Sequence, residues 1–286
     1  MNTYEQKKGW YLLQKTAVYF LIYLLFAFVA LVSVGPLIWV VISSFKTNGE
    51  ILTAPFALPQ KIDFGPYLEV IRGNNFMRYA LNSALISTVA TALSLVMYAM
   101  GAYVFARFNF PLKNILFTLF VLTMLIPGHT KTQPIFYIIM KLGLYGTLPG
   151  ITLVYLSGGI AMSLFVMRSA FAAIPKEMTE AAVIDGIGFF RNFWQMHVPL
   201  AKSGLATAGI LMFLGNWNEY FFASLLSASA STRTLPYALA FFTEAYSYDY
   251  TKMFAALTLI ILPGIIIYAV SQEQVQVSIT SGSVKG

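Results

Sequence analysis

The chain has no cysteine and very little charge. Only 10% of its 286 residues are Asp, Glu, Lys or Arg, whereas an ordinary soluble domain carries roughly 25%. With 58% hydrophobic residues, the chain has more apolar surface than a water-soluble core can absorb. The lack of cysteine excludes disulfides and thiolate metal sites, and with two histidines, His129 and His197, we expect no metal site in this chain.

Two further absences narrow the function. The chain contains no G-x-x-x-x-G-K-[ST] loop, so it lacks the backbone cradle and the lysine that bind nucleotide phosphates. It also has no cluster of His, Asp and Glu that could supply a matched acid and base, which sets a membrane enzyme aside. The net charge of +7 does not predict nucleic-acid binding, because the basic residues stand singly at the edges of apolar runs.

Long charge-free runs are what the sequence has instead. A charge at the bilayer centre costs roughly 2.5–3.5 kcal/mol, so such runs locate membrane spans. We predict an all-α polytopic membrane protein, a single transmembrane domain over residues 1–286 with six helices. The predicted spans are residues 17–44, 79–106, 114–130, 147–169, 204–226 and 253–272. The first exceeds the roughly 7–15 apolar residues of a cleavable signal peptide, so we interpret it as a retained anchor.

The distribution of lysine and arginine gives an orientation. With the N-terminus in the cytoplasm, the shorter connections carry their positive charge inside. Both termini and the polar segment 171–203 are then cytoplasmic, while residues 227–252 form an outer loop rich in Ser, Thr and Tyr. Proline and glycine pairs at Gly35-Pro36, Pro127-Gly128 and Pro263-Gly264 can bend the helices or simply be tolerated there.

The segment Ile174–Gly204 is far more polar than its flanks and predicts two short helices. Pro175 suits the first position of a helix, and Glu177 and Glu180 favour the positive N-terminal end of the helix dipole. Gly186 then suits the C-terminal stop.

Small residues on the first of these helices predict a docking surface. Ala181 and Ala182 add little bulk, so another protein's backbone or groove can approach closely, and Ile184 supplies an apolar contact. An ordinary amphipathic cytoplasmic loop is the alternative.

The run from Glu180 to Pro199 resembles the pattern E-A-A-x3-G-x9-I-x-L-P, which marks the permeases of binding-protein-dependent ABC importers. Met196 and Val198 stand where the family usually has isoleucine and leucine, and both are conservative apolar replacements. Asp185, before the glycine, is frequent in the same family.

In that family the element is the coupling helix, which inserts into a cleft on a cytoplasmic ATPase subunit and transmits its closure to the membrane helices. The resemblance implies an ATPase-docking set of Glu180, Ala181, Ala182, Ile184, Asp185 and Gly186. It also implies a second homologous permease, two ATPase subunits that bind ATP and Mg²⁺, an extracytoplasmic binding protein, and a place in the bacterial cytoplasmic membrane. The chain itself would need no cofactor and would not be an enzyme.

Two features are similar to maltose-type carbohydrate permeases. One is the run Asn216-Trp217-Asn218-Glu219 late in the fifth span, where amides suit sugar hydroxyls and a tryptophan suits an apolar sugar face. Glu219 is the one acidic residue that we place at membrane depth, and it either lines the substrate pathway or holds neighbouring helices together. The other is the short Gly-containing tail Thr280–Gly286, which in a maltose-type importer reaches the ATPase pair.

The sequence therefore predicts the permease subunit of an ATP-driven importer of a sugar or oligosaccharide. An importer permease for a polyol, glycerol phosphate or amino acid stays open. So does an ion-coupled secondary transporter, although such a transporter normally needs buried ionisable residues or discontinuous helices around a midplane site, and Glu219 is its one candidate residue.

Overall fold

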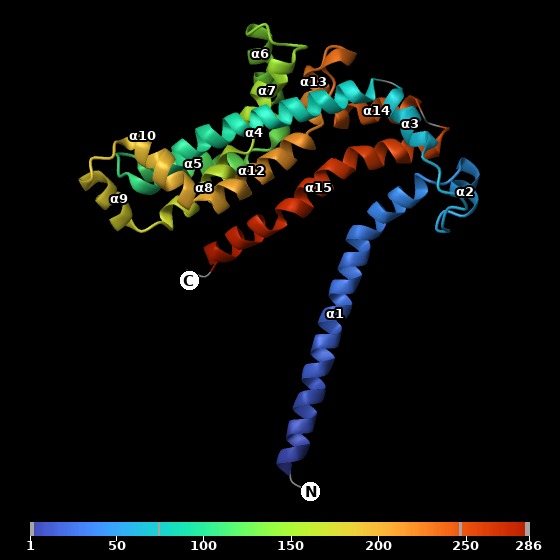
Figure 1. Ribbon diagram of the computed structural model, residues 1–286, viewed down its shortest axis with the longest axis horizontal. Helices are drawn as coiled ribbons and strands as arrows, with labels where there is room; N and C mark the ends of the chain where they lie inside the picture. The colour runs from blue at the N-terminus through green and yellow to red at the C-terminus, as the bar shows by residue number, and fades with distance from the viewer. Residues whose placement is uncertain (1–2, 74, 246–247, 284–286) are drawn as a thin grey trace. The chain divides into compact units, whose positions relative to one another are not determined.

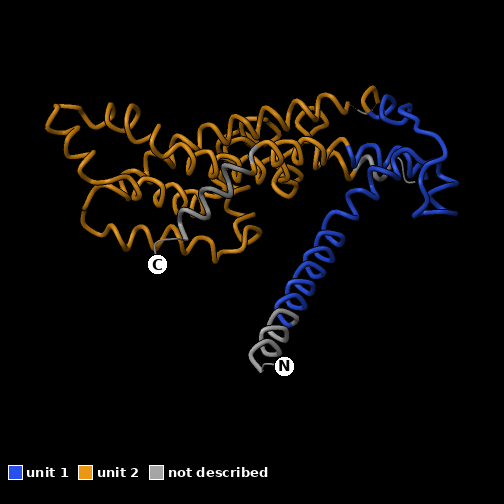
Figure 2. Tube along the Cα trace, turned by 60° about the horizontal axis from the view of Figure 1, so that its bottom comes forward, with its two compact units in different colours: residues 1–70, 246–258 blue, residues 71–245, 259–286 orange. Residues whose placement is uncertain are grey.

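The computed structural model describes residues 3–73, 75–245 and 248–283, and its regular elements are helices, with no strand in that part of the chain (Figure 1). The all-α prediction is confirmed. The chain divides into two compact units, residues 1–70 with 246–258 and residues 71–245 with 259–286 (Figure 2).

The elements follow one another along the chain, and residues 54–64 form the connection between α2 and α3. The first half comprises α1 (Thr3–Ser43), α2 (Asn48–Thr53), α3 (Gly65–Arg72), α4 (Phe76–Arg107), α5 (Lys113–Leu122), η1 (Thr123–Leu125), η2 (Gly128–Lys131), α6 (Thr132–Lys141) and α7 (Leu148–Ser157). The second half comprises α8 (Ile160–Ala172), α9 (Lys176–Ile184), α10 (Phe189–Asn192), η3 (Phe193–His197), α11 (Val198–Leu200), α12 (Lys202–Trp217), α13 (Phe221–Leu226), η4 (Ala230–Thr232), α14 (Leu235–Ala245) and α15 (Tyr250–Ser283).

Three of the described helices are long and apolar enough to cross a membrane by themselves: Gln14–Ser43, Phe76–Arg107 and Tyr250–Val270. Three further candidates are bent pairs, and the number of crossings rises to as many as six if each pair is one span. The pairs are Lys113–Leu125 with Gly128–Lys141, Leu148–Ser157 with Ile160–Ala172, and Phe189–Leu200 with Lys202–Trp217. The six-span count therefore stays a prediction.

The bends have local causes. The first pair turns by 104° at Pro127-Gly128, one of the three sites where the sequence allows a bend. Pro36 and Pro263 lie inside α1 and α15, and neither interrupts the assigned helix. The sequence analysis missed the 53° bend between α7 and α8, which falls at Gly158-Gly159. Gly159 has φ +67°, a left-handed conformation that costs a side chain about 1–2 kcal/mol.

One other prediction changes in the structure. The outer loop 227–252 is not a plain loop, because α14 occupies its middle. The C-terminal tail is helical as far as Ser283, where α15 ends, and residues 284–286 lie outside the described residues.

The core of the second unit lies where α4, α8 and α12 meet. Its buried side chains come from all three helices: Tyr98, Ala102, Tyr103, Leu164, Met167, Phe171, Leu205, Ala208 and Met212. Gly204 permits the close approach of α12 to α8, since a Cβ atom there would lie 2.3 Å from the Cβ of Ala170. Packing this tight leaves no room for an added methyl group.

Buried hydrogen bonds organise the first unit. The Lys46 ammonium is buried and donates to the carbonyl of Pro55 at 2.7 Å, while the Thr251 hydroxyl donates to the carbonyl of Lys46 at 2.6 Å. Glu50 forms a capping box with Thr47 at the start of α2. Hydrogen bonds from the backbone of Thr47 and Gln60 hold the pKa of Glu50 below its usual value.

Candidate functional site

The polar segment 171–203 contains α9, and the residues at both ends of this helix suit their positions. Pro175 is the N-cap, one position before the first helical residue, and Glu177 lies in the first turn. Beyond the helix, Gly186 has φ +73°. The amide of Ile187 donates to the carbonyl of Ala182 at 2.9 Å, and that of Gly186 to Val183 at 3.0 Å. This pair of bonds is a Schellman motif, which satisfies the last carbonyls and ends the helix.

The six residues of the predicted docking set do not share one surface. Ala182 is only 4% exposed and packs within its own chain. The other five are exposed, with Ile184 at 85%. A partner that docks on α9 would therefore meet five of the six residues, and Ala182 would support the helix from beneath. The docking role itself stays a prediction.

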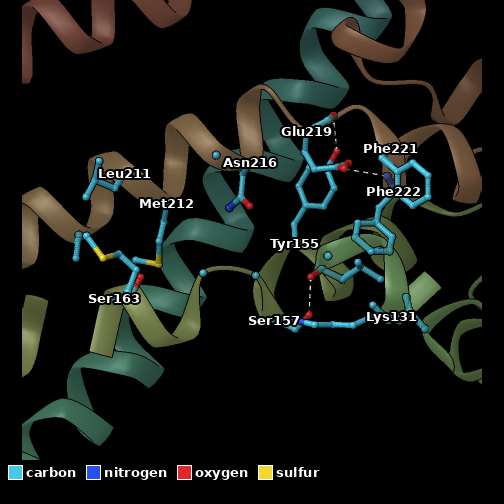
Figure 3. A pocket seen from close by; sticks show the side chains of 18 of the residues that line it. Lys131, Tyr155, Ser157, Ser163, Leu211, Met212, Asn216, Glu219, Phe221 and Phe222 are labelled. Atoms are coloured by element: carbon cyan, nitrogen blue, oxygen red, sulfur yellow. Dashed lines mark hydrogen bonds between the residues drawn. The ribbon is translucent and has the colours of Figure 1, made fainter. Parts of the chain in front are cut away.

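A cavity of about 500 Å³ lies in the second unit (Figure 3). Its lining residues come from η2, α6, α7, α8, α12 and α13 and from the connections between them. Most of its lining is apolar, with a few polar side chains among the lining residues. These are His129, Lys131, Tyr155, Ser157, Ser163, Asn216 and Glu219. Pockets of this size with a small number of polar groups are typical small-molecule sites.

The cavity includes two of the four predicted substrate-pathway residues, Asn216 and Glu219. Asn216 lines it and donates from Nδ2 to the Thr91 hydroxyl of α4 at 3.1 Å. Trp217 and Asn218 are not among the lining residues. Trp217 is 6% exposed and stacks on Phe213, with ring centroids 6.0 Å apart. Asn218, the C-cap of α12, is exposed, and its side chain donates to the carbonyl of Leu214 in that helix at 2.9 Å.

Glu219 lines the cavity but its carboxylate is already engaged. One oxygen accepts from the amide of Phe222 at 2.9 Å and the other from the amide of Ala223 at 3.0 Å, so the side chain caps the start of α13. Its carbonyl accepts from the Tyr155 hydroxyl of α7 at 3.1 Å. This geometry supports the interpretation that Glu219 holds neighbouring helices together.

Sequence reasoning missed the basic side of the cavity. Lys131 comes just after the end of the third predicted span, where the sequence predicts an outer turn. The break at Pro127-Gly128 brings it into the lining together with His129, whose ring packs edge-on against Phe221 at 4.3 Å. In Figure 3 the Lys131 side chain runs along the cavity toward Ser157. Within the described residues no group of His, Cys, Asp and Glu could hold a metal ion.

Comparison with known proteins identifies the family. Residues 98–280, more than half of the chain, match the family of binding-protein-dependent transport system inner membrane components. The chain belongs to this family.

Relatives match over nearly the full chain. The diacetylchitobiose uptake system permease protein NgcG of Streptomyces coelicolor is 32% identical over 89% of this chain and 85% of its own length. The trehalose transport system permease protein SugB of Mycobacterium tuberculosis is 32% identical over 88% of this chain and 92% of its own. One solved structure, a bacterial ABC transporter involved in the import of the acidic polysaccharide alginate, is similar with a TM-score of 0.80 and 25% identity, covering 91% of this chain and 97% of that one.

The family assignment fixes the general role. This chain is a membrane permease of an ABC importer, and it works together with a binding protein and further subunits. The membrane location agrees with its apolar helices.

Proposed function

We propose that this chain forms part of the pathway by which a sugar or oligosaccharide, delivered by an extracytoplasmic binding protein, crosses the bacterial cytoplasmic membrane. The observation that carries the proposal is the 32% identity over nearly nine tenths of the chain to two permeases named for disaccharide uptake. ATP and Mg²⁺ bind to separate ATPase subunits, because this sequence has no phosphate loop of its own.

In this proposal α9 is the docking element. Its exposed surface, from Glu180 to Gly186, combines an apolar tip at Ile184 with acidic side chains. When the ATPase pair closes on ATP, α9 moves with it, and the membrane helices change from inward-facing to outward-facing. Both termini and α9 lie on the cytoplasmic side, and the chain crosses six times.

The cavity at Asn216 forms part of the substrate pathway. Its mixed lining of apolar side chains, two serines, an amide and a phenol matches the chemistry of a sugar, which has apolar faces and many hydroxyl groups. Trp217 and Asn218 support this pathway from outside the cavity.

An anionic solute is the second candidate, and Lys131 is the observation that favours it. Lys131 is part of the cavity lining, while the carboxylate of Glu219 is stabilised by two backbone amides. Replacing Lys131 with Met distinguishes the two. For a neutral sugar, the concentration that gives half-maximal uptake should change less than about threefold. For an anionic solute, that concentration should rise about tenfold or more, the range expected for the loss of a charged hydrogen bond.

Affinity purification tests the assembly. The tagged chain, solubilised in mild detergent, should recover a second permease and an ATPase in stoichiometric amounts. Reconstitution of that complex in liposomes with its binding protein should then give sugar uptake that depends on ATP. Recovery of the chain alone, together with uptake driven by an ion gradient without ATP, would overturn the proposal in favour of a secondary transporter.

A further inference from the structure

A buried histidine joins the cytoplasmic segment to the membrane helices. His197 is 0% exposed and ends η3. Its ring centroid lies 4.7 Å from that of Tyr103 in α4 and 6.5 Å from that of Phe171 in α8. The ring therefore lies where α4 and α8 meet the segment that follows α9.

Both ring nitrogens of His197 have partners. Nδ1 is 3.3 Å from the carbonyl oxygen of Asn192, and Nε2 is 3.1 Å from the hydroxyl of Thr179 in α9. A carbonyl can only accept, so Nδ1 carries the proton and donates it. In the neutral ring Nε2 then accepts from the Thr179 hydroxyl, a tautomer that is assigned from its hydrogen-bond partners.

The backbone around His197 has an unusual shape with an identifiable cause. Residues Phe193–His197 form a π-helix, in which the amide of Val198 donates to the carbonyl of Phe193, five residues earlier. Pro199 cannot donate a backbone hydrogen bond, and in a regular α-helix its ring would clash with the carbonyl of Gln195, four residues earlier. The chain widens here into a π turn, a feature often found at functional sites.

The inner face of α9 rests on only a few contacts. Ala182 is its buried residue and Thr179, one turn earlier, is partly buried, while its other residues are exposed. At the entry to the helix, Nη2 of Arg107 in α4 donates to the carbonyl of Ile174 at 2.6 Å. The hydrogen bond from Thr179 to His197 is thus a polar link from the middle of α9 to the packed helices.

We propose that the Thr179–His197 hydrogen bond is the joint that makes α9 move as one body with α4 and α8. Thr179 and His197 then act by holding α9 in position against α4 and α8. The inference rests on the proposed function, because it requires an ATPase that displaces α9. Without the link, α9 can tilt on its own, and ATP is hydrolysed while the membrane helices stay in place.

The test uses the complete importer in liposomes and records uptake and ATP hydrolysis in the same vesicles. Thr179→Val keeps the shape of the side chain and removes the hydroxyl. We expect it to lower the number of sugar molecules imported per ATP about fivefold, the effect of one hydrogen bond of average strength. Thr179→Ser, which keeps the hydroxyl, should restore the ratio. Hydrogen exchange should become faster in α9 of the valine variant and stay unchanged in α4.

A matched control separates the joint from a general effect of losing a threonine hydroxyl. Thr152 donates to the carbonyl of Leu148 within its own helix at 2.8 Å, so that bond links no second element and Thr152→Val should leave the ratio unchanged. His197→Phe combined with Thr179→Val should be no worse than His197→Phe alone, because both remove the same bond.

The possible failures are distinct. If the wild-type complex shows no ATP-driven uptake, the proposed function fails and the joint falls with it. If the wild type imports sugar and Thr179→Val has the same ratio, or the serine variant does not recover it, the joint alone is overturned.

Discussion

Glu219 illustrates how the same residue type supports two interpretations until its neighbours are known. An acidic residue late in a membrane span is a candidate for substrate binding. In the structure its two oxygens accept from the amides of Phe222 and Ala223, the second and third residues of α13, which is the chemistry of a helix cap. Asn216, one turn earlier, lines the cavity, and its side-chain nitrogen Nδ2 donates to Thr91, which leaves the side-chain oxygen Oδ1 for a substrate hydroxyl.

Glu219→Gln should therefore destabilise the protein more than it changes its affinity for sugar. A glutamine has one acceptor oxygen where the carboxylate has two, so one of the two amides loses its partner. We expect the free energy of unfolding to fall by about 1–3 kcal/mol, the usual cost of an unsatisfied buried polar group. The measurement is a lower unfolding temperature of the purified complex. Half-maximal uptake should need the same sugar concentration within about twofold.

Asn216→Ala is the companion variant. It removes the hydrogen bond to Thr91, so it should lower the unfolding temperature, but less than Glu219→Gln does, and it should raise the sugar concentration needed for half-maximal uptake. The reverse pattern, with Glu219→Gln changing affinity and leaving stability intact, would assign the carboxylate to the substrate.

At the scale of single helices, glycines decide where α9 ends and how closely α12 approaches α8. Gly186 has φ +73°, and a Cβ atom added to it would meet nothing within 4 Å, so a side chain there meets backbone strain and no clash. At Gly204 a side chain would meet a clash and no backbone strain, because the backbone is helical and Ala170 fills the space beside it.

Gly186→Ala should strain the end of α9 by roughly 1–2 kcal/mol, the cost of a left-handed conformation for an L-residue. We expect less uptake per ATP hydrolysed, with normal insertion in the membrane. Gly188→Ala is the control, because Gly188 has φ −66° and a Cβ atom there would also meet nothing within 4 Å. Equal uptake per ATP from both variants would show that the end of α9 has no part in coupling.

Gly204→Ala should destabilise the second unit by roughly 1–3 kcal/mol, as overpacking does. Gly209→Ala on the same helix should be neutral or slightly stabilising, because the nearest atom to its new Cβ is 3.7 Å away and alanine favours helices. Thermal unfolding of the two purified variants measures the difference. If they unfold at the same temperature, α12 and α8 are not packed as closely as the structure places them.

At the scale of the whole molecule, the absence of cysteine makes the orientation easy to test. Every cysteine introduced is the only one in the chain. Tyr248, which precedes α15, is 91% exposed, and Ile184 on α9 is 85% exposed. Replacing either residue with cysteine therefore removes no buried side chain.

Tyr248→Cys should react with a membrane-impermeant maleimide added outside intact cells stripped of any outer membrane. Ile184→Cys should react only after the membrane is opened, because α9 faces the cytoplasm in the proposed topology. Reaction of Ile184→Cys from outside would invert the topology and remove α9 from the reach of a cytoplasmic ATPase.

Several features follow from local sequence alone. Apolar runs too long for a soluble core predict membrane helices, and the structure has an all-α fold with such runs. The spacing from Glu180 to Pro199 predicted the family to which the chain belongs. Gly186 predicted where α9 ends, and Pro175 predicted its start to within one residue, because both positions depend on backbone preferences that each residue carries with it.

Other features depend on contacts between residues far apart in sequence or on the bends between helices, and only the tertiary structure decided them. Lys131 lines the cavity because the helix pair around Pro127 is bent. Trp217 lies outside the cavity lining, and its indole Nε1 donates to the carbonyl of Ile260 in α15 at 3.4 Å. His197 meets Thr179 because a π turn and the rings of α4 and α8 place it there. Hydropathy predicts which segments form membrane helices, and motif spacing predicts the family. The partner of a buried polar group, however, depends on how the helices pack.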